Sequence, residues 1–130
     1  MTVRSEVESK LATFASTRTP AVPVAFENVP FTKPTAGNYL AIYFLGEKTI
    51  NRDLSGEHYA TYGMFQVSVY GKLGEGMGRL ETLANEIVAL FPIVPKMLLT
   101  SVEATPNIGP RTTEDDFASI PVTVRYRAEF

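Results

Sequence analysis

YATYGMFQVSVYGKLGEGMGRLETLANEIVALF, residues 59–91, combines three local patterns without a break. Apolar and polar residues alternate as far as Tyr70, as side chains do in a strand with two different faces. Glycines are frequent in residues 71–78. From Leu80 to Phe91, apolar residues recur at steps of three and four, which is typical of an amphipathic helix. The segment therefore predicts a strand, a turn and a helix in succession.

The two faces of the expected strand differ in character. The face expected in the core carries Tyr59, Thr61, Phe65, Val67 and Val69. The opposite face carries Ala60, Tyr62, Met64, Gln66, Ser68 and Tyr70. Tyrosine and methionine are enriched at protein interfaces, because they combine large apolar area with some polarity or flexibility. We expect this second face to contact a partner.

Two helices are expected. The apolar stripe of the later one is Leu80, Leu83, Ala84, Ile87, Val88 and Phe91. Pro92 and Pro95 follow it, and proline lacks the amide hydrogen that a further helical turn would need. Steps of four, four and three from Val3 to Phe14 predict a first helix over about residues 3–15.

The remaining strands complete a sheet. They are a short edge strand at Val24–Glu27, a strand at Asn38–Leu45 that is apolar on both faces, a short strand at Leu98–Glu103 and a final strand at Ala118–Glu129. We expect the second of these to be covered on both sides. The order of elements predicts an α+β fold, with a mixed, mainly antiparallel sheet and two helices packed on one face.

The final strand alternates regularly, with Arg125 and Arg127 on its polar face. Pro121 cannot donate a ladder hydrogen bond, so it predicts an edge or a bulge where this strand begins.

Two long loops are expected. The first, residues 46–57, is polar and longer than most loops without a function. It is a candidate contact loop, with Lys48, Asn51, Arg52 and Asp53 as its contact residues. The second, residues 105–117, contains the acidic run of Glu114, Asp115 and Asp116. A solvated loop is the favoured interpretation of this run, over a cation site or an arginine held across an interface.

Composition excludes several classes of protein. The 130 residues are enough for one domain that folds without disulfides, and there is no cysteine for a thiolate metal site. A net charge of −2 argues against a nucleic-acid binder, which needs positive charge against phosphate. No apolar run is long enough to cross a bilayer and no signal peptide is present, so we expect a soluble protein.

No group of residues indicates catalysis or a cofactor. The glycines of GKLGEGMGR, residues 71–79, match neither the dinucleotide fingerprint nor the phosphate-binding loop, and a plain turn is favoured. His58 is the one histidine, and its neighbours Asp53 and Glu57 have no regular spacing that would direct them to a metal ion. No serine nucleophile motif occurs. We expect a protein that is not an enzyme.

Three segments carry a resemblance to a known family. AVPVAFENVPF (residues 21–31), FQVSVYGKLGEGMGRLETLANEIVALFP (65–92) and IPVTVRYRAEF (120–130), after an N-terminal helix, resemble the tail terminator proteins of long-tailed phages, the minor tail protein U type. The resemblance spans residues 7–130. It implies an α+β protein of the virion tail, assembled in the bacterial cytoplasm. Its ring, expected to be a hexamer, would cap the tail tube and offer a surface to the head connector.

A ring requires two different binding surfaces on each subunit, one for each neighbour. The candidate interface residues are Tyr62, Met64, Tyr70, Arg125 and Arg127, with Asp115 and Asp116 of a neighbour as expected partners of the arginines. Exposed sheet edges near Val24 or Pro121 offer strand addition as a further contact. DNA passing through such a ring would require a lumen that is neutral or acidic.

Two other classes of protein remain open. A head-to-tail adaptor, or another neck component of a phage, would share this composition and these surfaces. A small ligand-binding domain would instead need a closed apolar pocket with converging polar groups, which no set of residues indicates.

Overall fold

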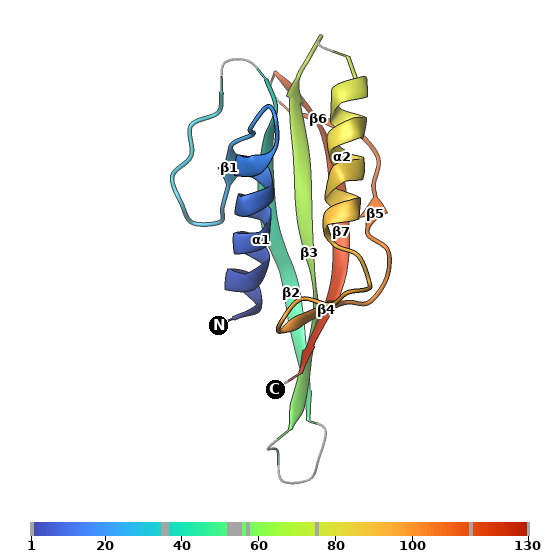
Figure 1. The fold of residues 1–130 in the computed structure, drawn as a ribbon. Helices are drawn as coiled ribbons and strands as arrows, with labels where there is room; N and C mark the ends of the chain where they lie inside the picture. The colour runs from blue at the N-terminus through green and yellow to red at the C-terminus, as the bar shows by residue number, and fades with distance from the viewer. Residues whose placement is uncertain are drawn as a thin grey trace.

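The computed structural model describes residues 2–34, 37–51, 56, 58–74, 76–114 and 116–129. Within this part of the chain there are two helices, α1 (Val3–Thr17) and α2 (Gly78–Leu90), and seven strands. The strands are β1 (Val24–Ala25), β2 (Tyr39–Asn51), β3 (Tyr59–Lys72), β4 (Thr100–Val102), β5 (Asn107–Ile108), β6 (Thr112–Glu114) and β7 (Phe117–Glu129). Figure 1 shows the strands running lengthwise, with the helices beside them.

Both predicted helices are present. α1 begins with a capping box, in which the Thr2 hydroxyl accepts the Ser5 amide at 3.0 Å and the Ser5 hydroxyl accepts the Thr2 amide at 2.9 Å. These bonds satisfy amides that no helical carbonyl reaches. α1 continues to Thr17, slightly beyond its predicted end, and α2 ends at Leu90, just before Pro92.

The strands form one sheet with the main order β1-β2-β3-β7-β4, and β5 and β6 also pair with β7. β1 is parallel to β2, while the other described pairs are antiparallel. The predicted α+β fold with a mixed, mainly antiparallel sheet is therefore confirmed. The predicted edge strand is also present, although it is limited to Val24–Ala25.

The main core combines the apolar stripes of the helices with alternate residues of the long strands. The strand residues include Leu40, Ile42, Phe65, Val67, Val69, Val122, Val124 and Tyr126. The buried residues of α1 and α2 belong to this same cluster, and Figure 1 shows the two helices along the same side of the strands. The predicted core faces of β3 and β7 are thus confirmed, except that Tyr59 is only half-buried.

The predicted loop at residues 46–57 is wrong over its first half. β2 continues to Asn51, so that residues 47–51 pair with residues 59–63 of β3. We call these two paired stretches the arm; Figure 1 shows it extending beyond the helices. Polar composition favoured a loop, but strand pairing satisfies the backbone of the arm without requiring an apolar sequence.

A bulge separates the arm from the rest of β2. The pairing register shifts between Phe44 and Glu47. Because an inserted residue reverses which side chains face each side of a sheet, the alternation that holds up to Phe44 does not continue into the arm.

The second predicted loop, residues 105–117, is also partly wrong, because it contains β5 and β6 along the border of β7. Pro121 lies between the parts of β7 that pair with these two strands, and its carbonyl accepts the Gly109 amide at 2.8 Å. The missing donor of Pro121 therefore falls in a gap of the ladder, where it leaves no partner unsatisfied.

The helix-free face of the sheet is covered at one end. Tyr39, Ala41, Tyr70 and Phe117 form a second buried cluster, with Phe31 of the proline-rich segment packed against it. Tyr39 and Tyr70 stack with ring centroids 4.6 Å apart. The expectation that this face is open along all of β3 is therefore wrong at Tyr70, and also at Ala60 and Ser68, which are buried.

The expectation that β2 is covered on both faces holds only for its first residues. Residues 39–42 are buried, but Tyr43 and Leu45 are 39% and 41% exposed. The proline-rich segment covers the first part of this face, and no described element covers the rest.

Candidate functional site: the open sheet face

The uncovered part of the helix-free face lies beside the base of the arm. Its residues are Tyr43, Lys48, Tyr62, Met64, Gln66, Thr123, Arg125 and Arg127, which we call the open face. The pairing register places them in adjacent rows: Tyr43, Gln66 and Thr123 in one, Met64 and Arg125 in the next, and Lys48, Tyr62 and Arg127 in the third. The structure thus brings together the predicted residues Tyr62, Met64, Arg125 and Arg127.

The open face is half apolar. Tyr62, Met64 and Gln66 are half-buried by their neighbours, while Arg125 is exposed. Aromatic side chains, methionine and arginine are the residue types that interface cores favour. An open, half-apolar surface next to cations is suited to binding another protein.

The charge on the open face is mainly positive. Arg127 pairs with Glu129 at 2.8 Å. Within the described chain, the side chains of Lys48 and Arg125 take part in no hydrogen bond or ion pair. The face therefore carries positive charge that an acidic partner could neutralise.

The predicted acidic partner of these arginines lies far away within the same chain. Asp116 is exposed at the start of β7, where its carbonyl accepts the Leu73 amide at 2.8 Å. From Asp116 to Arg125 the strand spans about 30 Å, at about 3.3 Å per residue. Asp115 and the side chain of Glu114 lie outside the described residues. A contact between Asp116 and Arg125 would therefore require two copies of the chain.

Of the four candidate contact residues of the first predicted loop, the structure describes two. Lys48 and Asn51 are exposed in the β2 half of the arm. Arg52 and Asp53 lie outside the described residues.

One exposed apolar segment was missed by the sequence analysis. Ile93, Val94 and Leu98, which we call the apolar loop, are 46%, 80% and 84% exposed. The loop leads into β4, whose partner residues in β7 also pair with the arm. A sequence signal was present for Ile93 and Val94, since they lie between the helix-ending Pro92 and Pro95. Leu98 was predicted to begin a strand, but β4 begins only at Thr100.

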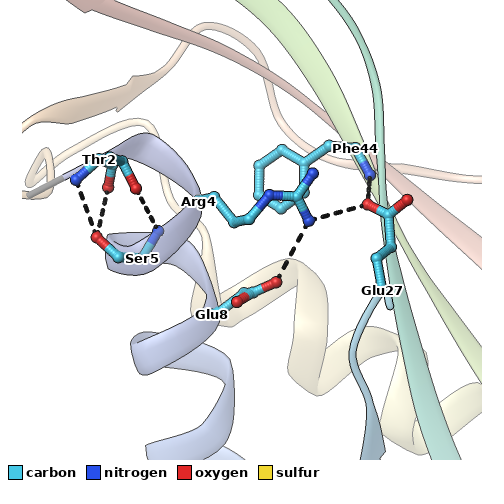
Figure 2. Close-up of polar contacts among 6 residues, drawn as sticks. All are labelled: Thr2, Arg4, Ser5, Glu8, Glu27 and Phe44. Carbon is cyan, nitrogen blue, oxygen red and sulfur yellow. Dashed lines mark hydrogen bonds and ion pairs between the residues drawn. The ribbon is translucent and has the colours of Figure 1, made fainter. Parts of the chain in front are cut away.

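A network of charged groups holds the start of α1 against the edge of β2. Figure 2 shows Arg4 between two carboxylates, 3.1 Å from Glu27 and 3.5 Å from Glu8. The same Glu27 oxygen accepts the Phe44 amide at 2.8 Å. This amide bond, followed by the contact with Arg4, lowers the pKa of Glu27 despite partial burial. Glu27 thus caps the edge of β2 at the point where β1 no longer covers it.

A second carboxylate caps the opposite border of the sheet. Glu6 accepts the amides of Leu99 and Thr100 at 2.9 and 2.8 Å. Burial alone would raise the pKa of Glu6, but these amide hydrogen bonds outweigh it and the pKa is lowered. α1 therefore closes the outer edge of β4.

Two cavities of the described chain show what kinds of side chain line its hollows. One of about 540 Å³ lies at the base of the arm and is lined by Arg4, Glu47 and Tyr126, among others. Another of about 740 Å³ is lined by prolines together with Arg18 and Arg79. Neither is lined by serine, cysteine or histidine, the usual nucleophiles and bases.

The structure places the sequence motifs that were considered for chemistry in a turn and at an exposed position before β3. Gly74 and Gly76 have φ of +90° and +84° and form the turn between β3 and α2. His58 is exposed, and its possible co-ligands Asp53 and Glu57 lie outside the described residues. Among the residues that the structure describes, no cluster of acidic, histidine or cysteine side chains could hold a metal ion. None of the described helices has both the length and the apolarity that a membrane crossing requires.

Comparison with known proteins relates the chain to phage tails. The family model described as phage tail terminator protein matches residues 2–126. A solved structure of a protein that bears no descriptive name is 38% identical to this chain, with a TM-score of 0.82. That match covers 98% of this chain and 94% of the other. No curated protein matches the sequence.

Proposed function

The chain belongs to the phage tail terminator family, and from this premise we propose that copies of it close into a ring that ends the tail tube and presents a surface to the head connector. The family gives it a structural role in a phage tail. The ring, its capping of the tube and its contact with the head are the proposal.

The observation that carries the proposal is the open face. Tyr62 and Met64 are only half-buried in a single copy, and the side chain of Arg125 has no partner within the described chain. The acidic Asp116 lies at the other end of β7. Two complementary surfaces at different places on one subunit produce a head-to-tail contact, which closes into a ring when the rotation allows it.

The apolar loop supports a contact with a different partner. Val94 and Leu98 are too exposed to stabilise the single chain by burial. They lie at the arm end of the sheet, away from the Asp116 corner. We assign this loop to the tail tube protein. The double variant Val94→Ser, Leu98→Ser should still form the ring, but the ring should be retained less well on purified tail tubes. Val29→Ser, at another exposed valine, is the control and should be retained as well as the wild type. Equal retention of the wild type, the double variant and the control would remove this assignment.

Electron microscopy of phage particles assembled without this protein tests the proposed function. A terminator limits tail growth, so its loss should give overlong tail tubes. Tails of normal length that are detached from heads would instead indicate the adaptor role. Complementation with the wild-type chain should restore joined virions with tails of normal length.

A further inference from the structure

The backbone edge of β2 in the arm is exposed, and the pairing register shows which groups it presents. In an antiparallel ladder each residue directs both its N–H and its C=O to the same side. The Phe44 amide bonds to Glu27 and so points away from β3. Its partner Phe65 must then face β7, and the even-numbered residues of β3 face β2.

This orientation continues into the arm, because β3 pairs with β7 without a shift of register. Tyr62 and Ala60 face β2, so their partners Lys48 and Ile50 face β3. Thr49, which lies between Lys48 and Ile50, therefore directs its amide and carbonyl outward, as do Glu47 and Asn51. Within the described chain, no backbone hydrogen bond satisfies these outward groups.

Other parts of the sheet border are closed by the chain itself. The Leu40 amide bonds to the Pro23 carbonyl, and the Phe44 amide to Glu27. On β4, the Thr100 amide bonds to Glu6 and its carbonyl accepts the Met97 amide at 3.0 Å. Proteins close exposed edges in such ways because an open edge recruits another strand. The unsealed edge of the arm contrasts with this pattern.

The opposite border of the sheet has an exposed edge of its own. Pro121 directs its carbonyl toward this border, so the other odd-numbered residues of β7 do the same. Ser119 and Phe117 thus bond Thr112 and Glu114, and Thr113 of β6 directs its backbone outward. Thr113 is exposed.

We propose that the outward edge of β2 around Thr49 adds to the outward edge of β6 around Thr113 in a second copy of this chain. Charge as well as geometry favours β6 of a second copy as the strand that adds to this edge. β6 leads into the turn that holds Asp116, within three residues of Thr113. The side chains of Lys48 in the arm and of Arg125 on the open face have no partner in the described chain. Addition of β6 therefore brings an acidic turn to the basic open face.

This contact is head-to-tail, because the two edges lie on opposite borders and at opposite ends of the sheet. Repetition of it around an axis closes a ring in which each joint uses one edge of each copy. The proposal rests on the ring of the proposed function and names the backbone contact that joins its subunits.

Proline at Thr49 gives a selective test. The Thr49 amide is unused within a single copy, and proline is tolerated where the amide would face solvent on an edge strand. Thr49→Pro should leave the circular dichroism spectrum of the single chain unchanged and raise the dissociation constant of the ring about tenfold or more, through the lost hydrogen bond and the pyrrolidine ring at the joint. Thr49→Ala, which keeps the amide, is the matched control and should assemble as the wild type does.

Cross-linking provides a second test that does not depend on how the proline variant folds. The chain has no cysteine, so Thr49→Cys with Thr113→Cys can be joined only at the introduced positions by a short bis-maleimide. A ladder of covalent species that ends at the ring size is expected. Thr49→Cys with Thr82→Cys, on the outer face of α2, and each single variant are controls that should give no ladder.

The outcomes separate this proposal from the ring itself. Rings formed by Thr49→Pro at wild-type concentrations, or equal cross-linking at Thr82, would overturn the edge contact and leave the ring standing. A wild-type protein that remains monomeric would overturn both.

Discussion

The hydroxyl of Tyr126 in β7 donates a hydrogen bond to Glu47 of β2 at 3.1 Å, passing over Gly63 of the strand between them. Tyr126 is buried in the main core and Glu47 is the first residue of the arm after the bulge. The contact therefore couples the core to the arm, and Gly63 makes it possible. A β-carbon on Gly63 would lie 2.6 Å from the Tyr126 hydroxyl and 2.8 Å from the Gly46 carbonyl.

Gly63→Ala should destabilise the chain by about 1–3 kcal/mol, the usual cost of forcing an extra methyl group into a filled site. Chemical denaturation followed by circular dichroism measures this cost. Gly78→Ala is the matched control, since nothing lies within 4 Å of a β-carbon there. Equal stability of the two variants would contradict the packing described for Gly63.

Tyr126→Phe should lower the unfolding free energy by about 1 kcal/mol at neutral pH, through loss of the hydrogen bond to Glu47. Burial first, and the neighbouring Glu47 second, raise the pKa of Tyr126 from 10.0 to about 12. The folded chain thus favours the neutral phenol, and wild-type stability should fall as pH rises from about 10 toward 12. Denaturation at several alkaline pH values should show a shallower fall for Tyr126→Phe; parallel curves would refute this assignment.

Glu27→Gln should make the free energy of unfolding less dependent on pH in the acidic range. The pKa of Glu27 is lowered in the folded chain, so its contribution is complete above the unfolded value of 4.5 and is lost as pH falls through the lower native pKa. The wild type should therefore lose stability below about pH 4.5, and Glu27→Gln should lose less over the same range. Glu103→Gln, an exposed control outside this network, should follow the wild type. The check is acid denaturation monitored by circular dichroism.

Exchange of charges tests the contact between copies. Arg125→Asp and Asp116→Arg should each reduce ring assembly, because each places like charges at the joint, and the double variant should restore it. Light scattering coupled to size exclusion distinguishes ring from monomer. Arg79→Asp, at an exposed residue of α2, is the control for a change of net charge. A double variant that assembles no better than either single one would show that these two residues do not meet.

Local patterns were sufficient for the parts of the fold that depend on one element. The alternation of β7 placed Arg125 and Arg127 on the face opposite Val124 and Tyr126, as observed. The same argument placed Tyr62 and Met64 on the open face. These four residues form half of the eight-residue open face, because face assignment requires only the period of a strand.

The remaining features depend on contacts between distant segments. The extension of β2 through the polar residues after Gly46 depends on pairing with β3 and on the space that Gly63 leaves for Tyr126. Tyr70 is buried because Phe31, far away in sequence, packs onto the Tyr39 cluster. β6 forms on the border that β7 offers. No local period carries such information, so these elements were predicted as loops or open surface.

Native mass spectrometry of the purified chain is the most direct test of the account, because the open face and the two exposed edges all require further copies. One closed oligomer of fixed size, expected to contain six copies, should be the main species at concentrations above the dissociation constant of the ring. A monomer at every concentration, with Tyr62 and Arg125 still accessible to solvent, would contradict the account.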